Sequence, residues 1–113
     1  MKTDFLNLFE SEYAQREFNP QETMQWLTAN RTVYFSWGTS KLINLNNKGL
    51  LLKVNGHHHK GYVLITLAWN DTYTVRFFNN QYNQVKNTLT EIYCDLLQDS
   101  IDEVIEKIDD YNY

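Results

Sequence analysis

The spacing of apolar and polar positions changes twice along the chain and predicts three regions. Up to residue 30, apolar residues recur every three or four positions, which predicts two short helices. One face of the first helix holds Phe5, Leu8, Phe9 and Tyr13. The second helix is expected to begin at Asn19, whose side chain can cap free amides, with Pro20 at the first helical position and Glu22 completing a capping box.

Between Thr32 and Tyr93 the pattern changes to β-branched and aromatic residues with a period of two, which predicts strands. The expected strands are Val33 to Trp37, Leu50 to Asn55, Tyr62 to Trp69, Tyr73 to Phe78 and, more weakly patterned, Val85 to Tyr93. Asn70-Asp71 is a turn that tolerates left-handed backbone, so the strands on either side of it should form a tight hairpin. The segment Lys41 to Leu45 fits either a short edge strand or a loop.

The last element has the clearest pattern, a single apolar stripe at helical spacing. Its members are Leu97, Ile101, Val104, Ile105 and Ile108. Asp95 is the expected cap, with Gln98 three positions later. The whole chain, residues 1–113, is therefore predicted to be one α+β domain. We expect an antiparallel meander of four to five strands, with two N-terminal helices and one C-terminal amphipathic helix packed on it.

Composition supports a folded chain. Apolar residues make up 42% of the sequence and aromatic residues 15%, which is ample for one core in a chain of 113 residues. No apolar run approaches the roughly 20 residues that cross a bilayer. Asp4 and Glu10 interrupt the N-terminal stretch that a secretory signal would need, and the single cysteine, Cys94, cannot form an internal disulfide. A cytoplasmic protein is expected.

Charge is divided between three regions, although the net charge is only −4. Residues 1–30 carry a net charge of −3, residues 31–90 carry +6 and residues 91–113 carry −7. The predicted strands are thus basic and the C-terminal helix is strongly acidic. Opposite charges are expected on different parts of the surface.

Three consecutive histidines, His57, His58 and His59, lie between Gly56 and Gly61, where two strands must be joined. A polar segment bounded by glycines is typical of a hairpin loop, so we interpret the run as a solvated loop tip. Zinc needs three or four convergent ligands, and adjacent residues in extended chain point to opposite sides. Since no HxxxH, HExxH or CxxC spacing accompanies the run, neither a metal site nor a cofactor is expected.

The sequence carries no motif typical of an enzyme. Cys94 has the apolar neighbours Ile92 and Leu96, which favour a packed cysteine over a nucleophile. The motifs GxxxxGK[ST], GxGxxG and GxSxG do not occur, and four glycines in the chain leave little material for a phosphate-binding loop. A non-enzymatic protein is expected.

The acidic C-terminal helix is the first candidate binding surface. Its carboxylates could meet a basic surface on a partner protein and compete for a site that normally holds phosphates. The predicted partner-binding residues are Asp95, Asp99, Asp102, Glu103, Glu106 and Asp109. Exposed helix faces are also commonly charged for solubility alone, so charge by itself does not identify a partner.

The basic, aromatic-rich strands are the alternative surface. Lys53, Lys60, Tyr62 and Arg76 are the ingredients of a stacking platform for single-stranded nucleic acid. Against this hypothesis, no RNP-like or helix-turn-helix pattern is present, the net charge is acidic, and aromatic residues in strands are usually core. A basic surface can also bind the chain's own acidic helix. A nucleic-acid-binding module is therefore the second hypothesis, behind a protein partner.

Four segments resemble small proteins encoded by bacteriophages and other mobile genetic elements. They are Trp37–Ser40, the hairpin segments Gly61–Leu67 and Asp71–Val75, and Ile92–Asp99 with its Y-x-D-x-L-Q start. The resemblance spans about residues 20–105, and it departs at Trp69–Thr72, where the usual turn contains glycine. It implies a protein without a settled activity that binds stoichiometrically to a host protein in the bacterial cytoplasm. Anti-CRISPR-like inhibitors of host defence are one such class.

Overall fold

Five antiparallel strands form the centre of the computed structural model, which describes residues 7, 9–14, 16–56 and 58–105. The strands are β1 (Lys41–Asn44), β2 (Leu50–Asn55), β3 (Lys60–Leu67), β4 (Tyr73–Phe78) and β5 (Leu89–Ile92). The helices are α2 (Pro20–Leu27), α3 (Arg31–Ser36) and α4 (Leu97–Ile105). Two single turns accompany them: η1 (Phe9–Tyr13) is π-helical and η2 (Cys94–Leu96) is 3₁₀-helical.

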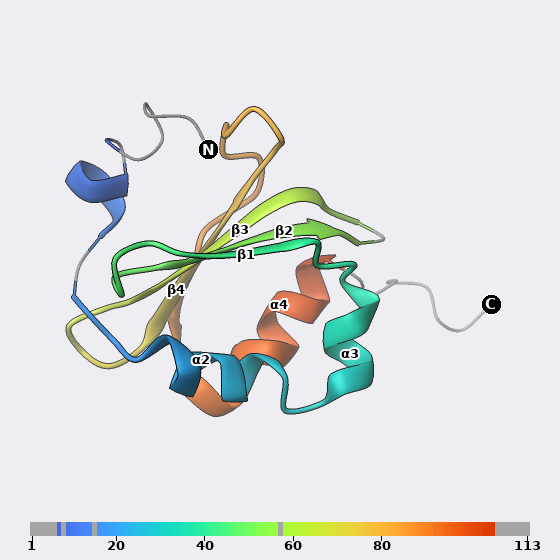
Figure 1. The fold of residues 1–113 in the computed structure, drawn as a ribbon, viewed down its shortest axis with the longest axis horizontal. Coiled ribbons are helices and arrows are strands. Elements are labelled where there is room, and N and C mark those ends of the chain that lie inside the picture. The colour runs from blue at the N-terminus through green and yellow to red at the C-terminus, as the bar shows by residue number, and fades with distance from the viewer. Residues whose placement is uncertain (1–6, 8, 15, 57, 106–113) are drawn as a thin grey trace.

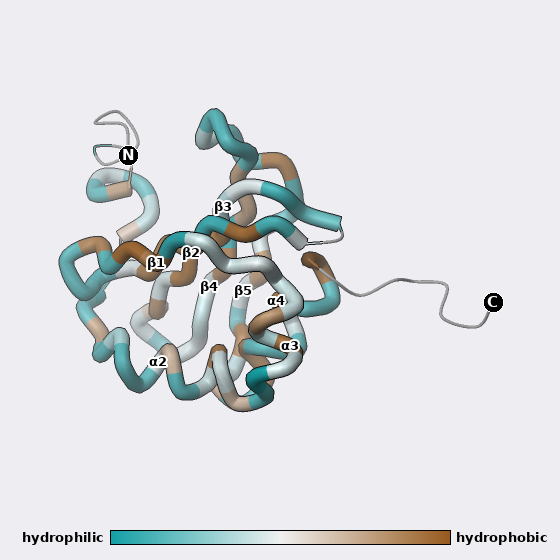
Figure 2. Tube along the Cα trace, turned by 45° about the vertical axis from the view of Figure 1, so that its right-hand side comes forward, coloured by the Kyte–Doolittle hydropathy of each residue, from teal (hydrophilic) through white to brown (hydrophobic). Residues whose placement is uncertain are grey.

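The sheet is a meander, because its strand order, β1-β2-β3-β4-β5, is the order of the strands in the chain (Figure 1). The predicted α+β class is therefore confirmed: five antiparallel strands, two short helices before them and a C-terminal helix that contacts α2. Lys41 to Leu45, which the sequence left open, contains the edge strand β1, with Leu42 paired to Leu52. Hydrophobic segments follow the strands and α4, whereas hydrophilic segments form the connecting loops (Figure 2).

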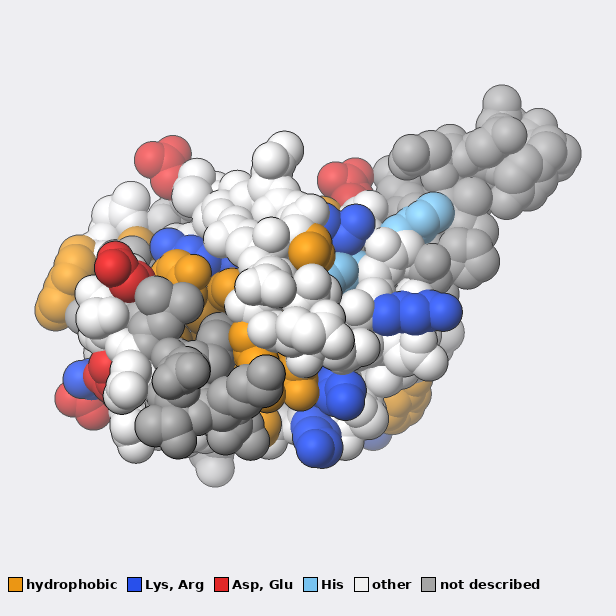
Figure 3. Space-filling model, turned by 90° about the horizontal axis from the view of Figure 1, so that it is seen from above, with side chains coloured by type: hydrophobic (Ala, Val, Ile, Leu, Met, Phe, Trp, Pro, Cys, Tyr) orange, Lys and Arg blue, Asp and Glu red, His pale blue; other side chains and the backbone are white. Residues whose placement is uncertain are grey.

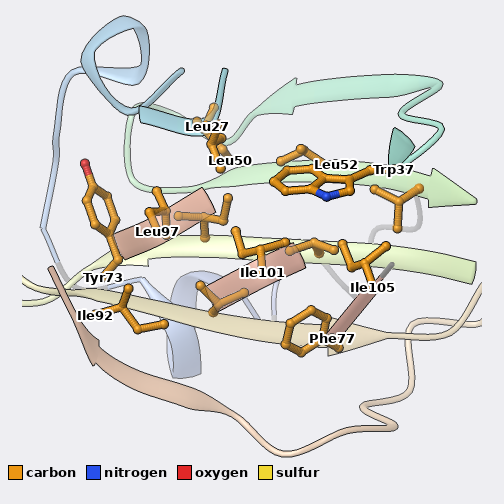
Figure 4. Close-up of a cluster of buried hydrophobic side chains, with 14 residues drawn as sticks. Leu27, Trp37, Leu50, Leu52, Tyr73, Phe77, Ile92, Leu97, Ile101 and Ile105 are labelled. Atoms are coloured by element: carbon orange, nitrogen blue, oxygen red, sulfur yellow. The ribbon is translucent and has the colours of Figure 1, made fainter. Parts of the chain in front are cut away.

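Both faces of the sheet are buried, each under a different cover. On the inner face, the side chains of β2, β3 and β4 pack against α2, α3 and α4 (Figure 4). This inner cluster includes Leu52, Val63, Phe77 and Ile101. On the outer face, alternate side chains of the same strands pack around Phe9 of η1 and form the outer cluster, which includes Leu51, Leu64 and Phe78. Burial on both faces explains why the central strands are almost continuously apolar rather than strictly alternating.

The hairpin of β3 and β4 forms where the sequence predicts it. Asp71 takes the left-handed conformation with φ 65°, and its amide donates to the Ala68 carbonyl at 3.0 Å. The Asn70 side chain accepts a hydrogen bond of 2.7 Å from the Thr72 hydroxyl and closes the turn further. β3 ends at Leu67, two residues before the predicted end of this strand.

The second predicted helix is confirmed as α2, and its start follows the predicted chemistry. The Asn19 side chain accepts a hydrogen bond from the Gln21 amide at 2.9 Å, and Pro20 is the first helical residue. Of the first predicted helix, Phe5 and Leu8 lie outside the described residues. Its described part is the turn η1, which inserts Phe9 into the outer cluster.

The predicted strand Val33 to Trp37 is wrong, because this segment is the helix α3. Asn30 supplies the helix start, since its side chain accepts from the Val33 amide at 3.3 Å. Gly38, with φ 62°, ends the segment in a left-handed conformation. Val33 and Trp37, four residues apart, both pack on the inner cluster, so the apolar positions have helical spacing as well as alternation.

The C-terminal helix is confirmed, but its predicted cap is not. Asp95 lies inside η2, where no side chain caps the turn, and α4 begins at Leu97. Gln98, expected near the exposed cap, is instead 8% exposed. Its amide nitrogen donates to the carbonyls of Leu27 at 2.7 Å and Asn30 at 2.8 Å, and its amide oxygen accepts from the Asn30 amide at 3.2 Å. One buried side chain thus links α4 to the segment between α2 and α3.

The histidine segment joins β2 to β3, as predicted, but it is not simply a solvated tip. His59 is 4% exposed, and its ring meets Phe77 edge-on at 5.4 Å between centroids. The backbone amide of His58 donates to the carbonyl of Ile105 at 2.6 Å. A backbone hydrogen bond therefore joins this loop directly to α4. His57 lies outside the described residues.

Replacing Gln98 with leucine should destabilise the protein strongly. The variant has a similar volume but leaves the Leu27 carbonyl and the Asn30 amide without the partners that Gln98 supplies, and each such loss costs about 1–3 kcal/mol. We expect urea denaturation to give a free energy of unfolding lower by about 2–4 kcal/mol. Gln25→Leu on the exposed side of α2 is the control and should stay within about 0.5 kcal/mol. Equal stability of both variants would contradict the role of Gln98.

His59 should make stability fall in mild acid. Burial lowers the pKa of His59 below its ordinary 6.5, and the charge of Lys86 acts in the same direction, against the hydrogen bond with the Tyr62 carbonyl. The unfolded chain therefore takes up the proton first, so stability present above the ordinary pKa is lost as pH falls toward the lowered one. The urea midpoint should decrease as the pH falls from neutral through the ordinary histidine pKa of 6.5. His59→Leu should flatten that decrease, and the exposed His58→Gln should keep it.

Candidate functional site

The turn η2 and the start of α4 expose apolar side chains between carboxylates. Tyr93 is 63% exposed and Leu96 is 50% exposed. Asp95 and Asp99, which flank Leu96, are exposed as well. These four residues, Tyr93, Asp95, Leu96 and Asp99, are called the acidic surface below. An apolar centre with a charged rim is the usual composition of a protein-binding patch.

The backbone directs these side chains outward. Just before them, β5 pairs irregularly with β4, and Glu91 takes φ 56° at the irregularity. The amide of Leu96 donates to the Tyr93 carbonyl at 2.9 Å, which closes η2 as a tight turn. Leu97 and Ile101 then point into the inner cluster. Since Leu96 precedes that stripe by one residue, it falls on the side of the helix that the core does not cover.

The carboxylates of Asp95 and Asp99 form no ion pair or hydrogen bond with any residue that the structure describes. The ion pairs among the described residues join Arg16 to Asp71 and Lys48 to Glu10. Neither ion pair involves a residue of the acidic surface. Like charges four residues apart on a helical surface repel each other and destabilise the helix slightly. Asp95 and Asp99 also lie in the first turns of η2 and α4, where a carboxylate is favourable near the free amides, so their charge contributes to helix formation and is still available to a partner.

The other predicted acidic residues have different surroundings. Asp102 is half-buried and accepts a hydrogen bond of 3.0 Å from the indole nitrogen of Trp37. Trp37 is fully buried in the inner cluster (Figure 4), so Asp102 stabilises the core. Glu103 is exposed on the same helix. Glu106 and Asp109 lie outside the described residues.

A hollow of about 330 Å³ opens beside η2. Cys94 lines it together with Phe18, Leu67 and Tyr73, and the ion pair of Arg16 with Asp71 lies at its wall. Cys94 is half-buried and packs on the inner cluster, as its apolar neighbours predict. Asn19 and Glu22 complete the lining, so the hollow is a concave feature of mixed polar and apolar character beside Cys94, which lies between Tyr93 and Leu96 in the sequence.

The predicted nucleic-acid-binding residues all lie on the outer face, but only some are accessible. Lys53 and Tyr62 are directly paired across β2 and β3, and the Lys53 ammonium lies 5.7 Å from the centre of the Tyr62 ring. Tyr62 is only 7% exposed, because its ring stacks on Tyr82 at 4.7 Å between centroids. Lys60, at the start of β3, is exposed.

Arg76 lies two strands away from Lys53 and is turned toward the cover of the sheet. Its guanidinium carbon lies 4.5 Å from the centre of the Tyr13 ring, and burial lowers the pKa of Arg76. One of its terminal nitrogens is buried without a hydrogen-bond partner among the described residues. The structure thus brings Lys53 and Lys60 together at one end of the outer face and places Arg76 with Tyr13 instead.

Among residues 7, 9–14, 16–56 and 58–105, no group of three or more His, Cys, Asp or Glu side chains is arranged to hold a metal ion. The described helices are also too short or too polar to span a bilayer.

Comparison with known proteins gives no relative. No family model, no curated protein and no solved structure matches the chain. The resemblance to small phage and mobile-element proteins therefore stays a prediction.

The sequence interpretation missed Tyr93 and Leu96. Tyr93 was assigned to a strand and Leu96 to the packing around Cys94, yet both are exposed. The signal was present in the helix pattern, because Leu96 does not belong to the stripe that Leu97, Ile101 and Ile105 define.

Asp102 and Asp99 should differ sharply in their effect on stability. Asp102→Ala leaves the buried indole N–H of Trp37 without its partner, which should lower the free energy of unfolding by about 1–3 kcal/mol. Asp99→Ala removes an exposed carboxylate and should change it by less than about 0.5 kcal/mol. Chemical denaturation of the two variants measures both values. If the two alanine variants were equally stable, Asp102 would be as free for a partner as Asp99.

Proposed function

We propose that this chain is a non-enzymatic binding protein that acts by stoichiometric association with another protein through the acidic surface. The observation that carries the proposal is the exposed pair Tyr93 and Leu96 between the unpaired carboxylates of Asp95 and Asp99. Tyrosine is among the residues that contribute most to binding energy at interfaces. Carboxylates at the rim accelerate association with a basic partner and orient it.

The chemistry of the acidic surface specifies the kind of partner. A complementary protein would present an apolar recess for Tyr93 and Leu96, surrounded by lysine or arginine. Such basic surfaces are typical of proteins that bind nucleic acid, so occupation by this chain would compete with phosphates. The resemblance to phage proteins supports a bacterial host protein of that kind in the cytoplasm, and inhibition of host defence, in the manner of an anti-CRISPR, is the role we propose.

Affinity capture followed by titration tests the proposal. The immobilised protein should capture a defined protein from a bacterial host lysate, and the purified partner should then bind in a one-to-one ratio in calorimetry. Tyr93→Ala should weaken binding by at least about thirtyfold, corresponding to an interface anchor of about 2 kcal/mol. The double variant Asp95→Lys/Asp99→Lys should weaken it by about tenfold or more, with a reduced dependence on salt.

The double variant Glu10→Lys/Glu12→Lys is the matched control, because it changes the net charge equally at exposed positions of η1, which covers the outer face of the sheet and contributes nothing to the acidic surface or the hollow beside it. Its affinity should stay within about twofold of the original chain, since charges beyond a Debye length are screened. Failure to capture any protein, or equal effects of both charge reversals, would refute the acidic surface as the binding site.

A further inference from the structure

A second hollow, of about 380 Å³, lies on the outer face of the sheet, where β2 ends and β3 begins. Its polar lining consists of Ser40, Lys53, Asn55, Lys60 and Asn80. These residues come from the segment before β1, from both strands and from the loop after β4. Its volume falls within the range of about 300–1,000 Å³ that small-molecule sites occupy.

Backbone contacts hold the walls of this hollow in place. The Ser40 amide donates to the Lys53 carbonyl, and the Asn55 amide donates to the Trp37 carbonyl, each at 2.9 Å. Gly61 lies against β4 so closely that a Cβ atom there would stand 2.2 Å from the Phe78 carbonyl oxygen. The hollow is therefore part of the folded framework rather than a gap between loose loops.

Positive charge gathers at this end of the outer face. Lys41 is the direct cross-strand partner of Lys53, and Lys60 lies across from Asn55. None of these three lysines forms an ion pair with a described residue. Like charges directly opposite each other on neighbouring strands are destabilising, so packing does not account for the pair of Lys41 and Lys53. Figure 3 views the molecule from above the orientation of Figure 1, and most of the visible Lys and Arg side chains lie in the right half of that picture.

Neutral hydrogen-bond donors complete the lining. The side chains of Ser40, Asn55 and Asn80 make no hydrogen bond to any residue that the structure describes. A hydroxyl group, two amide groups and two ammonium groups thus surround one cavity without a carboxylate among its lining residues. This set of groups matches an anion with several acceptor oxygens.

We propose that this hollow binds a phosphate group of a nucleotide-sized ligand, with Lys53 and Lys60 as its charged contacts. The Tyr62 ring beneath Lys53 favours one position of that ammonium through a cation–π contact. Since Tyr62 is itself stacked on Tyr82, recognition rests on phosphate rather than on base stacking. The phosphate belongs either to a free nucleotide or to the phosphodiester backbone of a single strand. The site is independent of the acidic surface and shares no residue with it.

Titration of the ¹⁵N-labelled protein, followed by NMR, tests the site with three probes: inorganic phosphate, adenosine monophosphate and a short oligothymidylate. The amide signals of Ser40, Asn55 and Gly61 should shift in a saturable manner with at least one probe. Lys53→Gln and Lys60→Gln should each raise Kd by about five- to tenfold. For the oligothymidylate, log K should fall against log salt with a slope of about −1.4, and each variant should reduce that slope by about half.

Arg31→Gln is the matched control. Arg31 is an exposed cation at the start of α3 that does not line the hollow, and its substitution removes the same charge as each lysine variant. Its Kd should remain within about twofold, since its charge is screened at that distance. Tighter binding of the oligothymidylate than of the mononucleotide assigns the phosphate to a nucleic-acid strand, and the reverse order assigns it to a free nucleotide. Absence of saturable shifts with all three probes, or an equal loss in Arg31→Gln, overturns the proposal.

Discussion

The position of α4 depends on the buried amide of Gln98. Without it, the carbonyl of Leu27 at the end of α2 and the amide of Asn30 before α3 would lack their hydrogen-bond partners. Hydrogen bonds of this kind fix both the distance and the rotation of a helix, whereas apolar contacts alone allow it to slide. Because Gln98 and Leu97 face inward, Asp95, Leu96 and Asp99 are necessarily directed outward. The acidic surface is thus a consequence of the same contact that completes the core.

Two parts of the surface gather like charges in different chemical settings. Asp95 and Asp99 are carboxylates in the successive turns η2 and α4, next to the exposed apolar side chains of Tyr93 and Leu96. Lys41 and Lys53 lie directly opposite each other on neighbouring strands, beside neutral hydrogen-bond donors. The difference in setting is the reason that we propose a protein partner for the first surface and a phosphate for the second.

The sequence predicted the elements that have a single interpretation. The turn at Asn70-Asp71, the start of α2 at Pro20 and the stripe of α4 follow from local rules that tertiary contacts leave intact. The strand prediction for α3 was wrong because its apolar positions fit both a strand period and a helical period. The choice of a helix depends on Asn30, which is held by Gln98, 68 positions away in the sequence. Burial of His59 and Gln98 was missed for the same reason, since their partners are distant in sequence. The exposure of Asp95 and Asp99 could be predicted from the sequence. The exposure of Tyr93 and Leu96 was missed, because it depends on which residues of η2 and α4 face the core.

The loop between β2 and β3 contacts both the hollow and α4. Asn55 and Lys60, at its two ends, line the hollow, and the His58 amide donates to the Ile105 carbonyl of α4. If a ligand in the hollow changes the affinity of α4 for a protein, thermodynamic linkage requires that the protein change the affinity for the ligand by the same factor. The hydrogen bond between His58 and Ile105 is the backbone contact through which such coupling would pass.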